Sequence, residues 1–182
     1  MSRLPQLNVA DLDPQQRQAL MALRSVISQD GTGGPFSVWL RMPGIGPAII
    51  DLFVTMRRQS KLDRRLFELM TLVIIRCWSA QFAWWAHGAR AQELGIASAV
   101  VEAIRTGRTP EIVRPDEKAV YDLTAEIMDK KSLSDATYGR AKQILGEPVL
   151  IELITSIGFY NMVGITLNVF DVPTPDGSKP LD

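Results

Sequence analysis

A long apolar segment near the carboxyl end constrains the fold more than any other feature of the sequence. It runs from Val149 to Phe170 and is long enough to cross a membrane as one helix. It contains Glu152, Asn161 and Asn168, however, and lacks the flanking cluster of basic residues that is usual for a membrane span. We therefore expect a buried helix, which requires other helices packed around it.

Helical spacing of apolar residues dominates the rest of the chain, and strand-like alternation is nearly missing. Asp13 and Pro14 supply an N-cap and a first-position proline for a helix through Leu20, Leu23 and Ile27. Further helices are expected at about 47–58, 61–76, 80–94, 98–107, 115–127 and 134–146. The sequence predicts an all-α, single-domain helical bundle over residues 1–182, with an amino-terminal arm at 1–12 and an extended proline-rich tail at 171–182.

Three of the expected helices follow a serine that could cap them. Ser60 and Asp63 resemble a capping box for the helix at 61–76, with Asp in place of the usual Glu. Ser79 and Ser134 are positioned to cap the helices that follow them. After Arg65 the helix at 61–76 is apolar nearly all round, which is typical of the centre of a bundle or of a subunit interface.

The composition excludes several classes of function. Twenty basic residues balance twenty acidic ones without a long basic run, so we expect neither a nucleic-acid nor a membrane partner. Cys77 is the only cysteine and His87 the only histidine, so an intrachain disulfide, a CxxC pair and a usual zinc site are excluded. The first residues contain no apolar run of the kind found in signal peptides. We expect a cytoplasmic protein without a cofactor or metal.

His87 lies among alanines and tryptophans on the expected helix at 80–94. Residues three, four and seven positions from His87 share its face of the helix. They are three alanines, a tryptophan, an arginine and a leucine: Ala80, Ala83, Trp84, Arg90, Ala91 and Leu94. This leaves room beside the imidazole for a ligand. The alternative is that the alanines admit a neighbouring helix while His87 binds a backbone carbonyl. Spacing favours this second interpretation.

Glu68 is the other polar residue in an apolar setting. Arg64 and Arg65 precede it by four and three residues, so an ion pair within the helix could satisfy it. The alternative is that Glu68 points inward and orients His87 or exchanges a proton with it. Spacing leaves both interpretations open.

The segment at 65–110 resembles the core motif of the carboxymuconolactone decarboxylase family, which also contains the alkylhydroperoxidase-D proteins. The matching features are a glutamate, an aromatic residue with a histidine, and an alanine–glycine step: Glu68, Trp84, His87, Ala91 and Gly95. GPFSVWLRMPG before this motif and GFYNMVGITLNVFDVPTPDG after it are similar to a longer decarboxylase-like subgroup. The resemblance covers most of residues 33–177 and implies an alkylhydroperoxidase-D-like fold.

Two departures from the family pattern narrow the implied chemistry. Peroxidase members carry a CxxC pair seven and four residues before the histidine, where this chain has Ala80 and Ala83. Thiol peroxidase chemistry needs two sulfurs within bonding reach and is therefore not expected. Many decarboxylase members have a glutamate at the position of Ala83, which leaves the exact substrate open.

The resemblance implies a cofactor-independent lyase of aromatic-compound catabolism that acts on a small lactone or ring-derived organic acid. Loss of CO2 leaves an electron pair that spreads into the lactone carbonyl, so such a site needs a hydrogen-bond donor at the oxyanion and an acid. We expect His87 to be the proton donor or oxyanion partner and Glu68 to set its tautomer. The same fold could also serve a hydrolase, a hydratase, an isomerase or a catalytically silent binding or assembly protein.

Other side chains are weaker candidates for substrate binding. Phe36 and Trp39 lie in a short aromatic turn, where core packing is an equal alternative. Tyr160 and Asn161 interrupt the apolar helix with polar atoms that could bind substrate or another helix. Trp84 lies one turn before His87, and an anionic substrate would favour an arginine, for which Arg41 and Arg90 are the candidates. The family also implies a homo-oligomer, whether trimer, hexamer or dimer.

Overall fold

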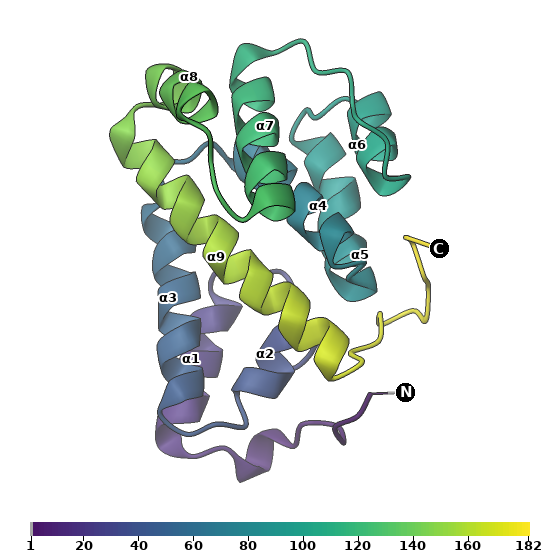
Figure 1. Ribbon diagram of the computed structural model, residues 1–182. Helices are drawn as coiled ribbons and strands as arrows, with labels where there is room; N and C mark the ends of the chain where they lie inside the picture. The colour runs from purple at the N-terminus through teal and green to yellow at the C-terminus, as the bar shows by residue number, and fades with distance from the viewer. Residues whose placement is uncertain (1) are drawn as a thin grey trace. The chain divides into compact units, whose positions relative to one another are not determined.

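The computed structural model describes residues 2–182, which form nine α-helices, one short 3-10 helix and no strand (Figure 1). The predicted all-α class is confirmed. The residues group into two compact units. The first comprises the chain up to Ser60 together with Thr166–Pro173, and the second comprises Lys61–Ile165 and Thr174–Asp182. The expected single domain, with its arm and tail, stays a prediction.

The first unit contains the 3-10 helix η1 (Val9–Asp11) and the helices α1 (Pro14–Arg24), α2 (Gly34–Trp39) and α3 (Ile45–Gln59). Asp13 caps α1 through a complete capping box with Gln16, as its sequence position predicts. The predicted extension of α1 to Ile27 is wrong. The hydroxyl of Ser25 donates to the carbonyl of Ala22 at 2.6 Å, and the amide of Val26 turns to Leu23 instead. The helix therefore ends at Arg24.

The second unit is built around α4 (Arg64–Cys77), whose residues from Leu66 to Ile75 are all buried. It packs against α5 (Gln81–Glu93), α6 (Ser98–Arg105) and α7 (Pro115–Lys130). α8 (Asp135–Leu145) packs on α7, and α9 (Glu147–Val169) supplies its residues up to Ile165 to this unit. Of the two interpretations of the apolar helix, α4 therefore fits the centre of a bundle.

Two of the three predicted serine caps are wrong. Asp63 caps α4 by accepting from the amide of Arg65 at 2.8 Å, so the helix begins three residues later than expected. The amide of Lys61 donates instead to the carboxylate of Glu152, at 2.8 Å. Ser79 has a positive φ of 49° and does not cap α5, which begins at Gln81. Ser134 caps α8 as predicted, by accepting from the amide of Thr137.

α9 is the expected long apolar helix. By length and composition it could cross a membrane, and half of its most apolar window is buried within the protein. Leu153, Ile157 and Tyr160 are on the buried side, whereas Ile151 and Ile154 are exposed. The expectation of a buried helix therefore holds for one side of α9 only.

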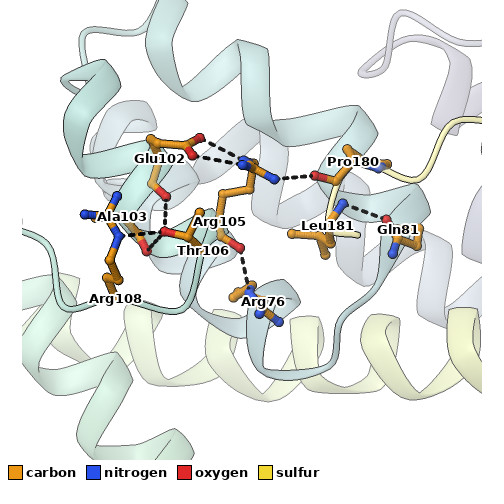
Figure 2. Close-up of polar contacts among 9 residues, drawn as sticks. All are labelled: Arg76, Gln81, Glu102, Ala103, Arg105, Thr106, Arg108, Pro180 and Leu181. Atoms are coloured by element: carbon orange, nitrogen blue, oxygen red, sulfur yellow. Dashed lines mark hydrogen bonds and ion pairs between the residues drawn. The ribbon is translucent and has the colours of Figure 1, made fainter.

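The end of the chain lies along α5 and α6 of the second unit. The backbone amide of Leu181 donates to the side chain of Gln81 at 2.9 Å, and Arg105 donates to the carbonyl of Pro180 at 3.3 Å (Figure 2). Figure 2 also shows that Arg105 is held from the other side by both carboxylate oxygens of Glu102, each at 2.8 Å. The segment Thr174–Asp182 is therefore tied to two helices.

Trp85 makes a further bond to this segment. Its indole donates to the carboxylate of Asp176 at 3.0 Å. Because Trp85 projects to a different helix face from His87, the sequence predicts that it is a core residue or a subunit contact. The structure shows a role that was not predicted, a hydrogen bond to the carboxyl-terminal segment. Tail residues far along the chain cannot be matched to a helix face by spacing alone.

We expect the contact between Asp176 and Trp85 to survive well into acid. Hydrogen bonds, first from Ser178 and then from Trp85, lower the pKa of Asp176 from its ordinary 3.8 to about 2. The depressed pKa belongs to the folded state, so the stability that the ionised carboxylate contributes is fully present above pH 3.8 and is lost as pH falls through about 2. The indole proton resonance of Trp85 should titrate with a midpoint near 2, and Asp176→Asn should abolish this titration. A midpoint near 3.8 in the wild type would contradict the contact.

Candidate active site

Glu68 is a buried carboxylate at the centre of the second unit. It lies in the second turn of α4, and its side chain is 1 % exposed. One oxygen, Oε2, lies 2.5 Å from Nδ1 of His87. The other, Oε1, lies 3.1 Å from Nε of Arg90. Burial of a carboxylate is costly unless it is paired and hydrogen-bonded, and α5 supplies both partners.

Arg65, one of the two arginines of the ion-pair alternative for Glu68, binds elsewhere. Its guanidinium contacts Asp116 at 2.5 Å and also pairs with Glu117, both at the start of α7. Burial acts to raise the pKa of Asp116, but the hydrogen bonds led by Arg65 outweigh it and lower that pKa. Arg65 therefore joins α4 to α7 and leaves Glu68 to the residues of α5.

The contact with Glu68 fixes the tautomer of His87. An ionised carboxylate can only accept hydrogen bonds, so Nδ1 of the imidazole carries the proton and donates it. The second ring nitrogen, Nε2, is then free to accept a proton or, when protonated, to donate one. The side chain of His87 is 19 % exposed, so this nitrogen belongs to a partly open site. The hydrogen-bond partner of His87 is therefore the carboxylate of Glu68, and not a backbone carbonyl as in the alternative interpretation.

Tyr160 reaches the imidazole from α9. Its hydroxyl lies 3.5 Å from Nε2 of His87, and the two rings meet edge to face with centroids 5.5 Å apart. Phe67 and Phe159 pack against the Tyr160 ring, which is buried. The phenol is thus held at the nitrogen that Glu68 leaves free.

Arg90 completes the group of polar side chains around Glu68. It lies one turn after His87 on α5, and its side chain is 37 % exposed, so its charge reaches the edge of the site. Nε is buried and lies within ion-pair distance of the Glu68 carboxylate, without a hydrogen bond to any described residue. The two remaining nitrogens of a guanidinium so held form an edge that matches a carboxylate.

Two other predicted site residues of the second unit have partners inside the bundle. Trp84 is buried, and its indole lies so close to Gly88 that a Cβ there would be 2.9 Å from Nε1. The Asn161 amide accepts from Trp78 at 2.8 Å and donates to the carbonyl of Ile157 at 2.9 Å. The bond from Trp78, at the end of α4, fits the helix–helix alternative for Asn161, and its role in substrate binding stays a prediction.

The remaining predicted residues belong to the first unit. Phe36 packs against Trp39 and Phe53, with ring centroids 5.7 and 5.0 Å apart. Arg41 donates to the carbonyls of Ser37 and Pro5, at 3.1 and 2.5 Å, and so ties the amino-terminal arm to α2. A role for these three side chains in substrate binding stays a prediction.

Thr71 is a polar residue that sequence reasoning missed. It is fully buried on α4, and its hydroxyl has no hydrogen-bond partner within residues 2–182. It follows Glu68 by three residues and so lies on the same face of the helix. That spacing was the available signal, but threonine in an apolar helix is common and gives no reason to single it out.

Two grooves lie away from the Glu68–His87 pair. One groove of about 380 Å³ lies between α7 and α8, and another of about 320 Å³ lies between α1 and α3. Across the described part of the chain, no three side chains of His, Cys, Asp or Glu are grouped so that they could hold a metal ion.

Comparison with known proteins places the fold. No family model matches the chain, and no curated protein matches it significantly. Among solved structures it is similar to a protein of unknown function from Agrobacterium tumefaciens, provisionally described as the antioxidant defence protein AhpD. The TM-score is 0.65 at 14% sequence identity, over 74% of this chain and 93% of the other. This chain has an AhpD-like fold. The predicted fold type is confirmed, and at this identity the AhpD-like match carries the fold alone.

Proposed function

We propose that the protein is a cofactor-independent carboxy-lyase of the decarboxylase-like subgroup, acting on a small lactone or ring-derived organic acid in aromatic-compound catabolism. The observation that carries the proposal is the contact between Oε2 of Glu68 and Nδ1 of His87, at 2.5 Å. A buried carboxylate that fixes one imidazole nitrogen directs the other at whatever lies in the site. We further propose that the enzyme is a cytoplasmic homo-oligomer.

His87 supplies the proton that the reaction requires. As the C–CO2⁻ bond of the substrate breaks, its electron pair passes through the ring double bond to the lactone carbonyl oxygen. The imidazolium then gives its Nε2 proton to the ring carbon, and the neutral ring regains a proton from water. Imidazole suits this exchange because one ring nitrogen can stay bound to Glu68 while the other gives and regains a proton.

Tyr160 and Arg90 stabilise the charges of the same reaction. The Tyr160 hydroxyl lies beside Nε2 of His87, where it can donate to the oxyanion that forms on the carbonyl. Arg90 offers its outer guanidinium edge to a carboxylate of the substrate and lies close to the Glu68 charge. The Glu68–His87 pair in its neutral form also has a free base at Nε2, which favours a hydratase or hydrolase as the second candidate.

The test is a screen of lactone acids and ring-cleavage acids for release of CO2, with product identification by mass spectrometry. We expect turnover of at least one such acid by the wild type and none by His87→Gln. Addition of water to the same substrates without CO2 release would replace the lyase by the second candidate. Undiminished turnover by a folded His87→Gln protein would overturn both, and binding without any reaction would indicate a catalytically silent protein.

A further inference from the structure

α9 carries an exposed apolar face in the second unit. Ile151, Ile154 and Ile165 are 62%, 42% and 46% exposed, although isoleucine is among the residues most often buried. Met162 lies between them and is half-buried. The opposite side of the helix is occupied, since Tyr160 and Val163 are buried. The exposed side therefore has no partner within the second unit.

The exposed residues are arranged symmetrically about Gly158. Ile151 and Ile154 precede it by seven and four residues, and Met162 and Ile165 follow it by four and seven. These spacings keep all five residues on one face of a helix. Gly158 itself is exposed, and a Cβ there would meet nothing within 4 Å. The face therefore has no side chain at its centre, and two large apolar side chains lie on each side of that position.

We propose that two copies of this chain associate through this face of α9, antiparallel, with the two-fold axis passing between their Gly158 residues. In a dimer with a two-fold axis, the same surface of each copy contacts that surface of the other copy. A helix face whose residues are spaced symmetrically about its centre is therefore complementary to itself in an antiparallel pair. Ile151 and Ile154 of each copy then pack against Met162 and Ile165 of the other. The glycines allow the two helix backbones to approach closely where they cross. The inference is independent of the proposed enzymatic function.

The charges on α9 select the antiparallel arrangement. Glu147 and Glu152 lie near its amino end, and no charged side chain follows until Asp171. An antiparallel pair keeps the glutamates of the two copies apart and sets the two helix dipoles in opposition. A parallel pair would bring Glu147 and Glu152 of the two copies together. The antiparallel arrangement therefore avoids a repulsion between like charges that the parallel one would have.

A lipid surface is the other apolar partner to consider for this face. Helices that lie on membranes carry Lys and Arg on their flanks and often Trp at the interface. Between Glu152 and Asp171 the chain has no Lys, Arg or Trp, and the centre of the face is a glycine rather than a large apolar residue. A second copy therefore fits the face better than lipid. Because a few helical turns form a small interface, we expect a dimer that dissociates on dilution.

The experiment is sedimentation velocity of the full chain over a concentration series, comparing the wild type with Gly158→Glu. The variant places two like charges face to face at the axis and should weaken association by ~100-fold or more. Gly139→Glu is the matched control, because Gly139 is also an exposed helical glycine where a Cβ would meet nothing within 4 Å, but it lies on α8. It should associate as the wild type does.

A charge-swap mixture tests the position of the axis. Gly158→Glu and Gly158→Lys should each remain monomeric alone, and an equimolar mixture should regain the dimer, since residue 158 meets its own copy only at a two-fold axis. A monomeric wild type at all concentrations would overturn the proposal, as would a dimer that persists in Gly158→Glu. Binding of neutral phosphatidylcholine vesicles by a monomeric wild type, lost in Gly158→Glu, would assign the face to lipid instead and would also overturn it.

Discussion

Replacing Glu68 by glutamine is expected to lower kcat by about 100- to 10,000-fold, the range that general acid–base catalysis contributes. The carboxylate holds the proton on Nδ1 of His87 through the 2.5 Å contact. A glutamine amide can instead turn its NH2 group to Nδ1, which moves the proton of the neutral ring to Nε2 and removes the negative charge that stabilises the imidazolium, the acid of the reaction. KM should change less than kcat, because Glu68 is buried and reaches the substrate only through His87 and through Arg90, whose Nε lies 3.1 Å from its carboxylate.

The tautomer can be observed directly, because His87 is the only histidine of the chain. Nitrogen-15 spectra should show Nδ1 protonated and Nε2 free in the neutral wild type, and a shift toward the other tautomer in Glu68→Gln. Glu93→Gln is the control, since it makes the same chemical change at an exposed position on α5. An unchanged kcat with a changed tautomer would remove Glu68 from the mechanism. A lower kcat with an unchanged tautomer would show that it acts in another way.

Replacing Gly46 by alanine is expected to destabilise the first unit by about 3 kcal/mol or more, at the upper end of the cost of overpacking. Gly46 lies at the start of α3, where a Cβ would be 1.9 Å from the carbonyl oxygen of Trp39 and 2.8 Å from its carbonyl carbon. That oxygen accepts from the amide of Met42 at 3.0 Å, so it cannot move without breaking the turn between α2 and α3. The obstacle is backbone, which relaxes less easily than a side chain.

Urea denaturation of the two single variants Gly46→Ala and Gly139→Ala measures this effect. Gly139 also lies within a helix but has open space around it, so alanine there should raise the free energy of unfolding by up to about 1 kcal/mol through helix propensity. The two substitutions should therefore have opposite signs. A Gly46→Ala protein as stable as the wild type would mean that α2 and α3 do not approach each other as described.

The sequence predicted those features that depend on neighbouring residues. The caps at Asp13 and Ser134 and the all-α class follow from local spacing, and the structure has them. The cap at Ser60 failed because a distant group competes for the same backbone: the amide of Lys61 binds Glu152, which is 91 residues away. No local pattern contains that information.

The residues of the candidate site also divide into features that local spacing predicts and contacts that depend on tertiary packing. The sequence singled out Glu68 and His87 as polar residues on apolar helices, but their contact depends on how α4 and α5 pack. The ion pair between Arg65 and Glu68, one of the two interpretations that spacing left open, does not form, because Asp116 and Glu117 bind Arg65 from α7, more than 50 residues along the chain. Tyr160 joins His87 across 73 residues. Spacing predicts which face a side chain occupies, and tertiary packing decides what it meets.

One turn of α5 is restrained from two directions. His87 is bound to the carboxylate of α4, and Trp85, two residues earlier, is bound to Asp176 of the carboxyl-terminal segment. The helix can neither rotate about its axis nor shift along it without breaking one of these bonds. The imidazole is thus preorganised: the folded protein already sets its orientation, so less conformational entropy is lost when a ligand binds.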